Sequence, residues 1–571
     1  MLKRLLVVFF TLIWFDLVLK PSMASPIPII KPRIISREEW GARNPKCEFE
    51  KNLSYNAITI HHTATSNEYV DAKSIIRAIQ KYHQDERGWC DIGYHFLIDK
   101  EGVIYEGRPL WAVGAHIKGY NKGNIGISLI GNYEEVNVNE KQIKALVELV
   151  SWLVYKYKIP LGNIKGHRDY ANTLCPGKYL YAKLLEIRRR VAQRVYGFGD
   201  IIGVAAWWGV YSNHWSSNRE EWERQIDEAF KTLKAIGINT VFFLAKDPWG
   251  YVYYESEYAP LNPKYSWDPL KYVIKRAREY NISIHVYVNV LSEGETRPSE
   301  FLNKHVEWAM RDIEGNALGW VDPSAEEYVD YLIKIVKELI QKYDIDGIQL
   351  DRIRIPRNAQ EFPISSEKFK VKYGVNPSKN PSEFKRFIIE RVSEVVRRVR
   401  DVIKEENPYL RVSAAVMPDP EIAKETYYQD WESWIKKGLV DFVIVMSYTS
   451  SSWTFKDYVD RAVRASGNTR PIYSGIGIYL DTMSTEILSE ELSCAFKKEG
   501  IYGVCFFNVD AILGRADLCK TLSNKLSELI KAGFIMEKPS ESNTWRFWLY
   551  IMLPAIIIAV ILIVLLLRKF D

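Results

Sequence analysis

The chain has little cysteine for its length and almost no excess charge of either sign. It contains six cysteines in 571 residues, too few for a small domain held together mainly by disulfides. Its 77 Lys and Arg residues exceed the 71 Asp and Glu residues by six, an excess too dilute to mark a nucleic-acid-binding surface. Tandem repeats and low-complexity tracts are also missing. Because 47% of the residues are hydrophobic and 13% aromatic, we expect compact domains and exclude wholesale disorder.

Each end of the chain carries an apolar segment typical of membrane targeting. Lys3 and Arg4 precede an apolar run at 5–19, and a small-x-small site follows, which predicts a signal peptide over residues 1–24. Residues 547–567 carry no charge and are long enough to cross about 30 Å of hydrocarbon as a helix. Arg568 follows directly and places the C-terminus in the cytoplasm. The sequence therefore predicts a single-pass protein of the cell membrane whose folded domains lie outside the cell.

Changes in composition divide the exterior part into two domains. Residues 30–195 contain six of the nine histidines, a density that would be odd for a purely structural domain. The turn-rich segment 196–200 is a joint. Residues 201–530 alternate strand-like apolar runs with amphipathic helical runs, and the polar segment 531–546 is expected to be a stalk leading to the membrane.

The fold class that these patterns predict is α/β in both domains. β-branched runs at 57–61, 94–98 and 125–130 and a helical pattern at 143–154 predict a mixed sheet in the first domain. Regular alternation over the second domain predicts a (β/α)₈ barrel. An open doubly wound sheet is less favoured, because no Gly-rich phosphate loop follows the first strand. The candidate barrel strands are 201–208, 239–246, 282–290, 346–352, 411–416, 442–448, 471–476 and 503–508.

Three side chains of the first domain form a candidate metal site. His61 ends a predicted strand, and His167 and Cys175 lie in one short segment farther along the chain. Two imidazoles and one thiolate suit Zn²⁺, and three protein ligands leave a fourth position open, as catalytic zinc requires. The alternative is that these are core histidines and a disulfide-bonded cysteine.

A series of motifs then extends this pattern over about residues 34–191. They are Ile-Ser-Arg-Glu-Glu-Trp-Gly-Ala-Arg at 35–43, Ile-His-His-Thr-Ala at 60–64, Gly-Tyr-His-Phe at 93–96, Val-Gly-Ala-His at 113–116, Gly-Tyr-Asn at 119–121, Ile-Gly-Ile at 125–127 and Cys-Pro-Gly at 175–177. In content and order the segment resembles the peptidoglycan recognition protein and type 2 N-acetylmuramoyl-L-alanine amidase family.

The resemblance implies one zinc ion on His61, His167 and Cys175, with Tyr94 and Thr173 beside it as catalytic residues. Such an ion polarises the amide carbonyl that joins a muramic lactyl group to L-alanine, and lowers the pKa of water towards about 7. Phage amidases of the family carry Lys where Thr173 stands, whereas catalytic recognition proteins often carry Thr. These motifs contain no obvious carboxylate base, so the acceptor of the water proton stays open.

The resemblance also assigns residues around the metal. His116 and Tyr120 are expected to line the groove for the glycopeptide, although packing is an alternative role for Tyr120. His62 is expected to be a packed histidine and Asp169 to orient a metal ligand. Because inactive recognition proteins typically lack the zinc cysteine, the presence of Cys175 favours an enzyme over a receptor.

The second domain resembles a glycoside-hydrolase-like barrel family in its fourth strand. The sequence Asp-Gly-Ile-Gln-Leu-Asp at 346–351 ends in Asp351, at the strand end where barrels carry their active sites. Relatives often have a second Asp where Arg352 stands, and chitinases have a catalytic Glu at the position of Ile353. Glycoside hydrolysis normally needs two carboxyl groups. The candidate partners of Asp351 are Asp247, Glu293, Asp419 and Asp510.

Other barrel residues are candidates for contacts with sugar. Tyr448 and Asn289 are expected to bind it, and three tryptophans are expected either to stack on sugar rings or to pack in the core: Trp207, Trp208 and Trp320. The sequence leaves open whether this barrel cleaves or only binds a glycan.

The remaining cysteines also leave alternatives. Cys47 and Cys90 could form a disulfide in the first domain, and Cys494 or Cys505 could pair with Cys519, with free buried thiols as the alternative. The function we predict is a membrane-anchored, zinc-dependent amidase of peptidoglycan whose barrel cleaves or binds the glycan. A non-catalytic peptidoglycan receptor and a glycosidase targeted by the first domain are the alternatives.

Overall fold

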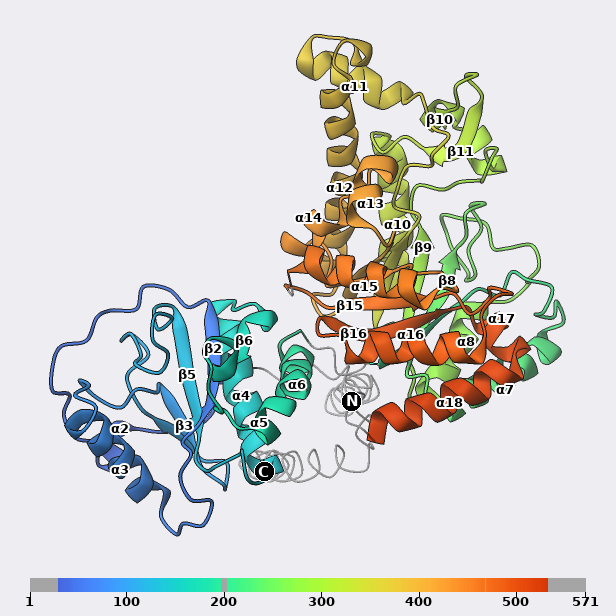
Figure 1. The fold of residues 1–571 in the computed structure, drawn as a ribbon. Helices are drawn as coiled ribbons and strands as arrows, with labels where there is room; N and C mark the ends of the chain where they lie inside the picture. Colours follow the sequence, from blue (N-terminus) through green and yellow to red (C-terminus); the bar gives the residue numbers. More distant parts are fainter. Residues whose placement is uncertain (1–28, 197–202, 468, 532–571) are drawn as a thin grey trace, which may run out of the picture.

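The computed structural model of the chain describes residues 29–196, 203–467 and 469–531 (Figure 1). Within these ranges no helix has both the length and the apolar composition needed to span a membrane. The predicted signal peptide at 1–24 and the predicted membrane helix at 547–567 lie outside the described residues, as does the predicted stalk apart from residue 531.

The first domain is built on a six-stranded mixed sheet with the order β1-β4-β3-β5-β2-β6. Only the pairing of β3 with β4 is antiparallel among the strands described in this sheet. The predicted strands at 57–61 and 125–130 are present as β2 and β5, and the one at 94–98 is shorter. The strands are β1 (Ile34–Ile35), β2 (Ala57–His62), β3 (Phe96–Ile98), β4 (Ile104–Glu106), β5 (Asn124–Leu129) and β6 (Ile164–Gly166).

Helices cover both faces of this sheet. The helices are α2 (Arg37–Trp40), α3 (Ala72–Asp85), α4 (Glu140–Tyr157), α5 (Lys178–Ala182) and α6 (Leu184–Tyr196). The side chain of Asn139 caps α4, and Lys158 ends the helix in a left-handed conformation two residues before Pro160. Ile58 and Ile60 belong to the same buried core as α4 and α6, whereas α3 packs in a separate cluster with Trp40 and Leu97.

The second domain is a closed barrel of eight parallel strands, as predicted. Each end of each strand lies within three residues of its predicted position. Because all eight are buried on both faces, they appear in the sequence as continuous apolar runs. The strands are β7 (Gly203–Trp208), β8 (Thr240–Lys246), β9 (Ser283–Asn289), β12 (Gly347–Asp351), β13 (Arg411–Val416), β14 (Phe442–Val445), β15 (Ile472–Ile476) and β16 (Ile501–Phe507).

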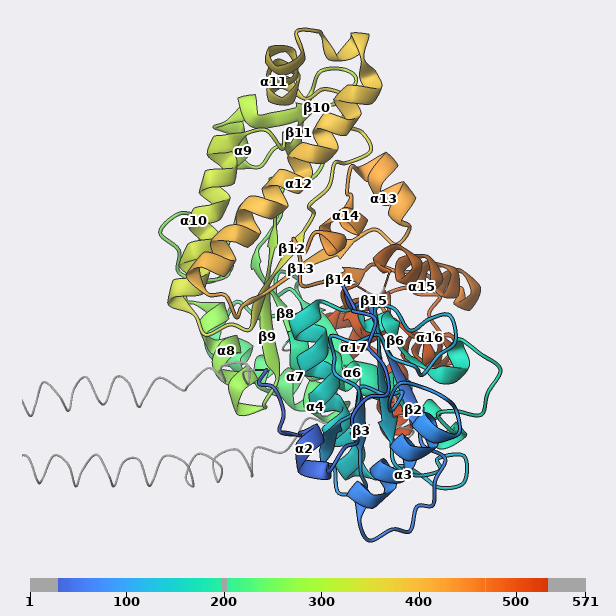
Figure 2. The same ribbon diagram turned by 90° about the vertical axis from the view of Figure 1, so that its left-hand side faces the viewer.

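Helices surround the barrel, and two insertions, one between β9 and β12 and one between β12 and β13, extend beyond it (Figures 1 and 2). The first insertion contains the antiparallel hairpin of β10 (Ala309–Arg311) and β11 (Ala317–Val321), and the second contains α11. The helices are α7 (Arg219–Ala235), α8 (Pro269–Glu279), α9 (Glu300–Asn303), α10 (Glu326–Lys342), α11 (Pro363–Tyr373), α12 (Pro381–Glu406), α13 (Pro420–Tyr427), α14 (Trp431–Lys436), α15 (Ser452–Ser466), α16 (Thr485–Lys497), α17 (Val509–Gly514) and α18 (Ala516–Lys531).

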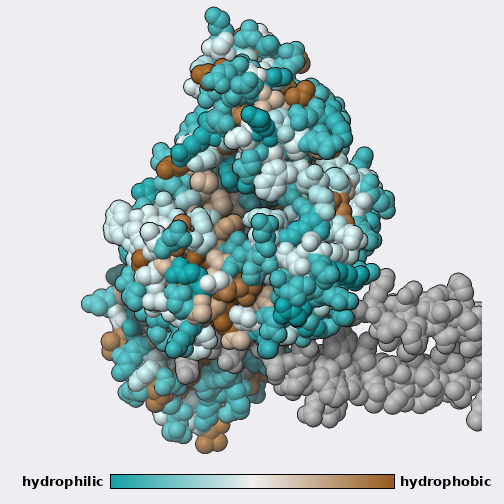
Figure 3. All heavy atoms as spheres, turned by 90° about the vertical axis from the view of Figure 1, so that its right-hand side faces the viewer, coloured by the Kyte–Doolittle hydropathy of each residue, from teal (hydrophilic) through white to brown (hydrophobic). Residues whose placement is uncertain are grey.

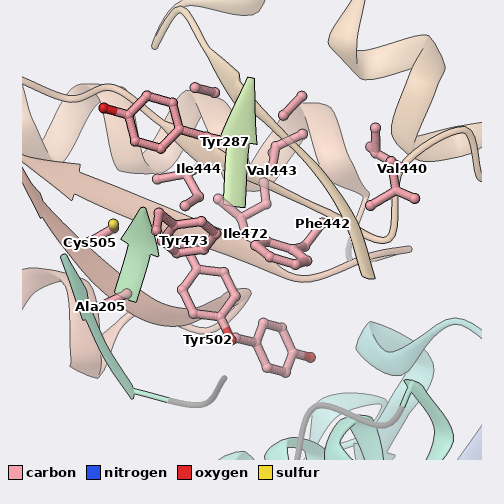
Figure 4. Close-up of a cluster of buried hydrophobic side chains, with 14 of the residues drawn as sticks. Ala205, Tyr287, Val440, Phe442, Val443, Ile444, Ile472, Tyr473, Tyr502 and Cys505 are labelled. Carbon is pink, nitrogen blue, oxygen red and sulfur yellow. The ribbon is translucent and has the colours of Figure 1, made fainter. Parts of the chain in front are cut away.

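Side chains fill the interior of the barrel, as Figure 4 shows for a cluster that includes Tyr287, Phe442, Tyr473 and Cys505. The alternative left open for the cysteines is now resolved. Cys47 and Cys90 form a disulfide, whereas three cysteines of the second domain are free thiols: Cys494, Cys505 and Cys519.

Candidate metal centre

The three predicted metal ligands come together at the end of two neighbouring strands. His61 lies near the end of β2, and His167 follows β6, which pairs with β2. Cys175 returns to the same place after a short loop. One possible ligand atom from each of these side chains lies within 4.8 Å of the other two. The structure thus unites residues that lie 106 and 114 positions apart in the chain.

His61 is held by a second histidine. Its Nδ1 lies 3.6 Å from Cys175 Sγ, while its Nε2 lies 3.1 Å from Nδ1 of His116. Nε2 of His116 lies 3.1 Å from the carbonyl oxygen of Asn124. A carbonyl only accepts, so His116 Nε2 carries the proton and His116 Nδ1 accepts from His61 Nε2–H. This arrangement leaves Nδ1 of His61 free to bind a metal beside the sulfur.

Two glycines leave room for the His116 ring. A Cβ atom on Gly114 or on Gly126 would lie 2.6 Å from a carbon of that ring. Any other residue at these positions would displace His116 from His61. The Gly-Ala-His and Ile-Gly-Ile motifs therefore have a packing role behind the candidate metal site.

Backbone contacts fix the loop that carries the other two ligands. The amide of Arg168 donates to the carbonyl of Cys175 at 3.1 Å, and the amide of Cys175 donates to the Thr173 hydroxyl at 3.2 Å. Asp169 accepts from the Gly166 amide at 2.8 Å and from the Tyr181 hydroxyl at 2.5 Å. Asp169 thus holds the turn at His167 through the backbone, which refines its predicted orienting role.

The electrostatics of the three donors fit a soft divalent cation. Burial lowers the pKa of His61 well below its ordinary value and also lowers that of His167, so both imidazoles are neutral near pH 7. Burial raises the pKa of the Cys175 thiol to about 12. A buried thiolate requires a positive charge beside it, and the set of two nitrogens and one sulfur is typical of zinc.

Tyr94 and Thr173 border the ligand cluster, as predicted. The ring centroid of Tyr94 lies 5.2 Å from that of His61. Burial and the nearby Cys175 raise the pKa of the Tyr94 hydroxyl, which therefore stays protonated and can donate a hydrogen bond. Thr173 accepts from the Cys175 amide, and its own hydroxyl proton remains available.

Three other residues predicted near the metal differ in their exposure to solvent and in their contacts. His116 is only 7% exposed and uses both ring nitrogens internally, so its contact with His61 replaces the predicted role in lining a groove. Tyr120 is 55% exposed and lies against Tyr170, with 5.1 Å between ring centroids. His62 is packed, as expected, and its Nδ1 accepts from the Tyr133 amide at 3.1 Å.

At the other domain, Asp351 ends β12, and its Oδ1 accepts from the Arg352 amide at 2.7 Å. Arg352 pairs with Glu295 at 2.7 Å, and the guanidinium groups of Arg352 and Arg354 lie 5.7 and 5.8 Å from the Trp320 ring. Glu295 follows β9, the neighbour of β12, and sequence reasoning missed it although it lies two residues after the candidate Glu293. The signal in the sequence that could have identified Glu295 was an acidic residue shortly after a predicted strand.

The four predicted carboxylate partners of Asp351 are engaged elsewhere. Asp247 accepts from the amides of Trp249 and Tyr251, and Asp510 accepts from Ser212 and Trp215. Asp419 caps α13 and pairs with Arg461 at 2.9 Å. Glu293 is fully buried and pairs with Lys246 at 2.5 Å. Each of the four acids thus has a structural partner, and Oε2 of Glu293 is the atom among them that is buried without a hydrogen bond to any described residue.

Aromatic side chains surround the end of the barrel at which Asp351 lies. Tyr448 is half-buried, with its ring centroid 5.5 Å from that of Phe507 and 5.9 Å from that of Tyr479. The same face of the molecule shows apolar side chains gathered in a hollow between hydrophilic rims (Figure 3). Three aromatic side chains that follow barrel strands at this end are 43–47% exposed, and we call them the rim aromatics: Tyr211 after β7, Trp249 after β8 and Tyr479 after β15.

Three other predicted sugar contacts are structural. Asn289 is 2% exposed and donates to the Lys246 carbonyl at 2.9 Å. Trp208 is fully buried, and Trp207 is 3% exposed with its indole nitrogen donating to Gln349. Asp346, which precedes β12, pairs with Arg278 at 2.7 Å and is also structural.

Comparisons with known proteins divide the chain at the same place as the structure. The family profile described as N-acetylmuramoyl-L-alanine amidase matches residues 51–178, and the one described as glycosyl hydrolase-like 10 matches residues 205–490. Peptidoglycan-recognition protein SC2 of Drosophila melanogaster is 41% identical over 156 residues, which span 26% of this chain and 84% of that protein.

Further relatives match the same first domain. Peptidoglycan recognition protein 3 of Homo sapiens is 38% identical over 153 residues, which span 26% of this chain and 45% of that protein. The solved structure of Drosophila PGRP-LB is 38% identical and covers 27% of this chain and 92% of its own, with a TM-score of 0.25. The amidase LysC from Clostridium intestinale URNW is 36% identical, with coverages of 26% and 91% and a TM-score of 0.23.

Proposed function

Because the chain belongs to the peptidoglycan recognition protein and N-acetylmuramoyl-L-alanine amidase family in its first domain, and to the glycosyl hydrolase-like 10 family in its barrel, we propose that it is a zinc-dependent amidase of peptidoglycan. The substrate bond is the amide between the muramic lactyl group and L-alanine. The observation that carries this proposal is the convergence of His61, His167 and Cys175 within 4.8 Å.

A zinc ion held by these three residues would supply a Lewis acid for the scissile carbonyl. The remaining catalytic and orienting roles are those of Tyr94, Thr173 and His116. The protonated hydroxyl of Tyr94 donates a hydrogen bond to the carbonyl oxygen as negative charge develops on it. Thr173 holds the Cys175 amide and directs its remaining proton towards the same region. His116 fixes the orientation of His61.

Catalysis is favoured over recognition alone because the ligand set is complete. A receptor needs to bind a glycopeptide but has no need of a buried thiol poised between two neutral imidazoles. Tyr94 beside His61 is a second feature that binding alone does not require.

The test uses the purified full chain in detergent, incubated with disaccharide-peptide fragments of peptidoglycan with and without a zinc chelator. The proposal predicts release of peptides with a free L-alanine amino terminus, loss of release with chelator, and recovery when Zn²⁺ is restored. A Cys175→Ala variant should bind the fragment without cleaving it. Binding by the native chain with no release in any condition would instead identify a receptor.

For the barrel, we propose that the surface around Asp351 binds the glycan backbone of the same polymer. Tyr448 and the exposed rim aromatics Tyr211, Trp249 and Tyr479 provide apolar faces suited to sugar rings. Hydrolysis by the barrel is the second candidate. Glu295 is then the proposed partner of Asp351, because both acids contact Arg352. New reducing ends produced by a Cys175→Ala variant, and lost on Asp351→Asn, would support it.

We also propose that the chain is a single-pass protein of the cell membrane, with both domains extracellular. The support is the sequence of residues 1–24 and 547–569: a signal-peptide pattern at one end, and at the other an uncharged apolar segment followed by Arg568 and Lys569. Protease added to intact cells should remove both domains and leave a membrane-embedded C-terminal fragment. Protection of both domains until the cells are lysed would contradict this orientation.

A further inference from the structure

Helix α6 joins the two domains by packing on both of them. Its apolar side lies in one continuous buried core with α4 and the sheet of the first domain, through Ile187, Val191 and Ala192. On the same helix, Arg188 donates to the Ile164 carbonyl of the sheet at 2.6 Å and forms an ion pair with Glu499 of the second domain. The helix is therefore a shared structural element of both domains.

Arg189 is the main polar contact of α6 with the barrel. Its side chain is buried, and its Nη2 donates to the carbonyl oxygens of Phe496 at 2.7 Å and Ile501 at 3.4 Å. Phe496 lies near the end of α16, and Ile501 begins β16. Both positions lie at the N-terminal end of the barrel strands, which we call the barrel floor. Because Arg189 is buried among barrel groups, we expect the two domains to keep one relative placement.

The barrel mouth, defined by the C-terminal strand ends at Asp351 and Phe507, points away from the first domain. Strand β16 runs from Ile501, beside Arg189, to Phe507, which contacts Tyr448. The six steps of about 3.3 Å between its seven residues place the mouth about 20 Å along the strand from the floor. In Figure 1 the first domain lies on the side of the barrel opposite α17, the helix that follows β16.

The candidate metal centre faces in the opposite direction. Side chains alternate along β2, so Ile58 and Ile60 face the core that contains α4 and α6, whereas His61 faces the other side of the sheet. Figure 1 shows α4 and α6 between this sheet and the barrel. The metal ligands and the barrel mouth are therefore separated by the sheet, a layer of helices and the length of the barrel.

From this arrangement we infer that the chain engages two separate places on the cell-wall polymer at once, one at each end of the molecule. A single disaccharide-peptide unit cannot contact both sites, so the chain connects neighbouring strands or layers, with its amidase site on one and its barrel mouth on the other. This inference rests on the proposed function of both domains. It excludes direct transfer of one sugar unit from the metal centre to the barrel.

The test measures bridging between two pools of sonicated peptidoglycan that carry different fluorescent dyes. The full chain is used in detergent, with Cys175→Ala and Asp351→Asn present to prevent cleavage, and light scattering verifies that it is monomeric. Tyr120→Ala weakens the first site, and Trp249→Ala with Tyr479→Ala weakens the mouth. The matched controls are exposed tyrosines elsewhere, Tyr82→Ala in the first domain and Tyr409→Ala near the barrel floor.

We expect the parent chain and both control variants to join the two dye pools in mixed aggregates, seen as at least a tenfold rise in two-colour particles. Each site variant should still sediment with peptidoglycan but should lose bridging. Tight sedimentation of the parent chain without bridging would overturn the inference, because both sites would then occupy one strand. Failure to sediment at all would refute the proposed function of the domains, which is a different result.

Discussion

His61 Nε2 lies 3.1 Å from His116 Nδ1, so a candidate metal ligand is oriented by a second buried histidine. Replacing His116 with Phe keeps an aromatic ring in the space left by Gly114 and Gly126 but removes both nitrogens. Partners of this kind typically contribute about 10- to 100-fold to metal affinity. We expect a loss of that size in zinc affinity, measured by competition with a chromophoric chelator.

The control for this prediction is His83→Gln. His83 is also buried in the first domain, but its Nδ1 accepts from the Gly93 amide at 3.2 Å and takes no part in the ligand cluster. This variant should keep the zinc affinity of the native chain even if it lowers stability. Equal affinities for native chain and His116→Phe would show that His61 needs no such partner.

Tyr94→Phe removes a hydroxyl that stays protonated because burial raises its pKa. Loss of one donor to a developing oxyanion typically slows turnover about 100- to 1,000-fold. We expect a fall in kcat of that order, with unchanged zinc content and a similar KM. The control is Tyr155→Phe, an exposed tyrosine on α4. If Tyr94→Phe changed KM alone, Tyr94 would contact the substrate without stabilising the reaction.

Glu491 on α16 is fully buried, and neither of its carboxyl oxygens has a hydrogen-bond partner among the described residues. Burial raises its pKa to about 9, against about 4.3 in an unfolded chain. Between these values folding takes up a proton, so Glu491 makes the folded state progressively less stable as the pH rises. Glu491→Gln should therefore increase the free energy of unfolding at pH 8 by roughly a few kcal/mol, because the difference in pKa between the folded and unfolded chain sets the size of this effect.

The same substitution should have little effect near about pH 3.5, below the pKa of about 4.3 in the unfolded chain, where the carboxyl group is largely protonated in both states. Denaturant unfolding at both pH values measures the difference. Glu490→Gln, at the exposed neighbouring position, should leave the pH dependence unchanged. A stability gap that is independent of pH would mean that Glu491 does not change its protonation on folding.

Arg189→Met removes the guanidinium that joins α6 to the barrel floor while retaining an unbranched side chain. The carbonyl oxygens of Phe496 and Ile501 would lose their charged hydrogen-bond donor. A buried acceptor left without a partner typically lowers the free energy of unfolding by about 1–3 kcal/mol. We expect the thermal unfolding of the two domains to separate into two transitions in calorimetry. Arg190→Met, on the same helix but paired with Glu140 and Glu186 of the first domain, should retain the coupling of the native chain.

The barrel could be predicted from the sequence because its strands are buried on both faces. They therefore appear as continuous apolar runs, unlike the alternating apolar and polar residues of strands with one face in solvent. Helix limits were also readable where capping residues mark them. Asn218 caps α7, and Asp268 with Pro269 begins α8, so each helix starts at a residue whose type marks a helix start in the sequence. The antiparallel hairpin β10–β11 was not predicted, because its strands are short and interrupted by a polar turn.

The metal ligands were predictable from residue type, but the groups behind them were not. His116 lies in a loop with no periodic pattern, and it meets His61 across 55 positions of sequence. Asp419 was misjudged for a different reason. It is followed by Pro420, a common start of a helix, and that local signal of a capping role was outweighed by its position after a strand.

The buried placement of Arg189 has a practical consequence for work on the barrel alone. A shortened protein that begins at residue 203 would leave the carbonyls of Phe496 and Ile501 and the rings around them in contact with water. Such a fragment should aggregate, whereas one that also includes α6 would expose the side of that helix which normally packs on α4. The barrel is therefore best produced together with the whole domain that precedes it.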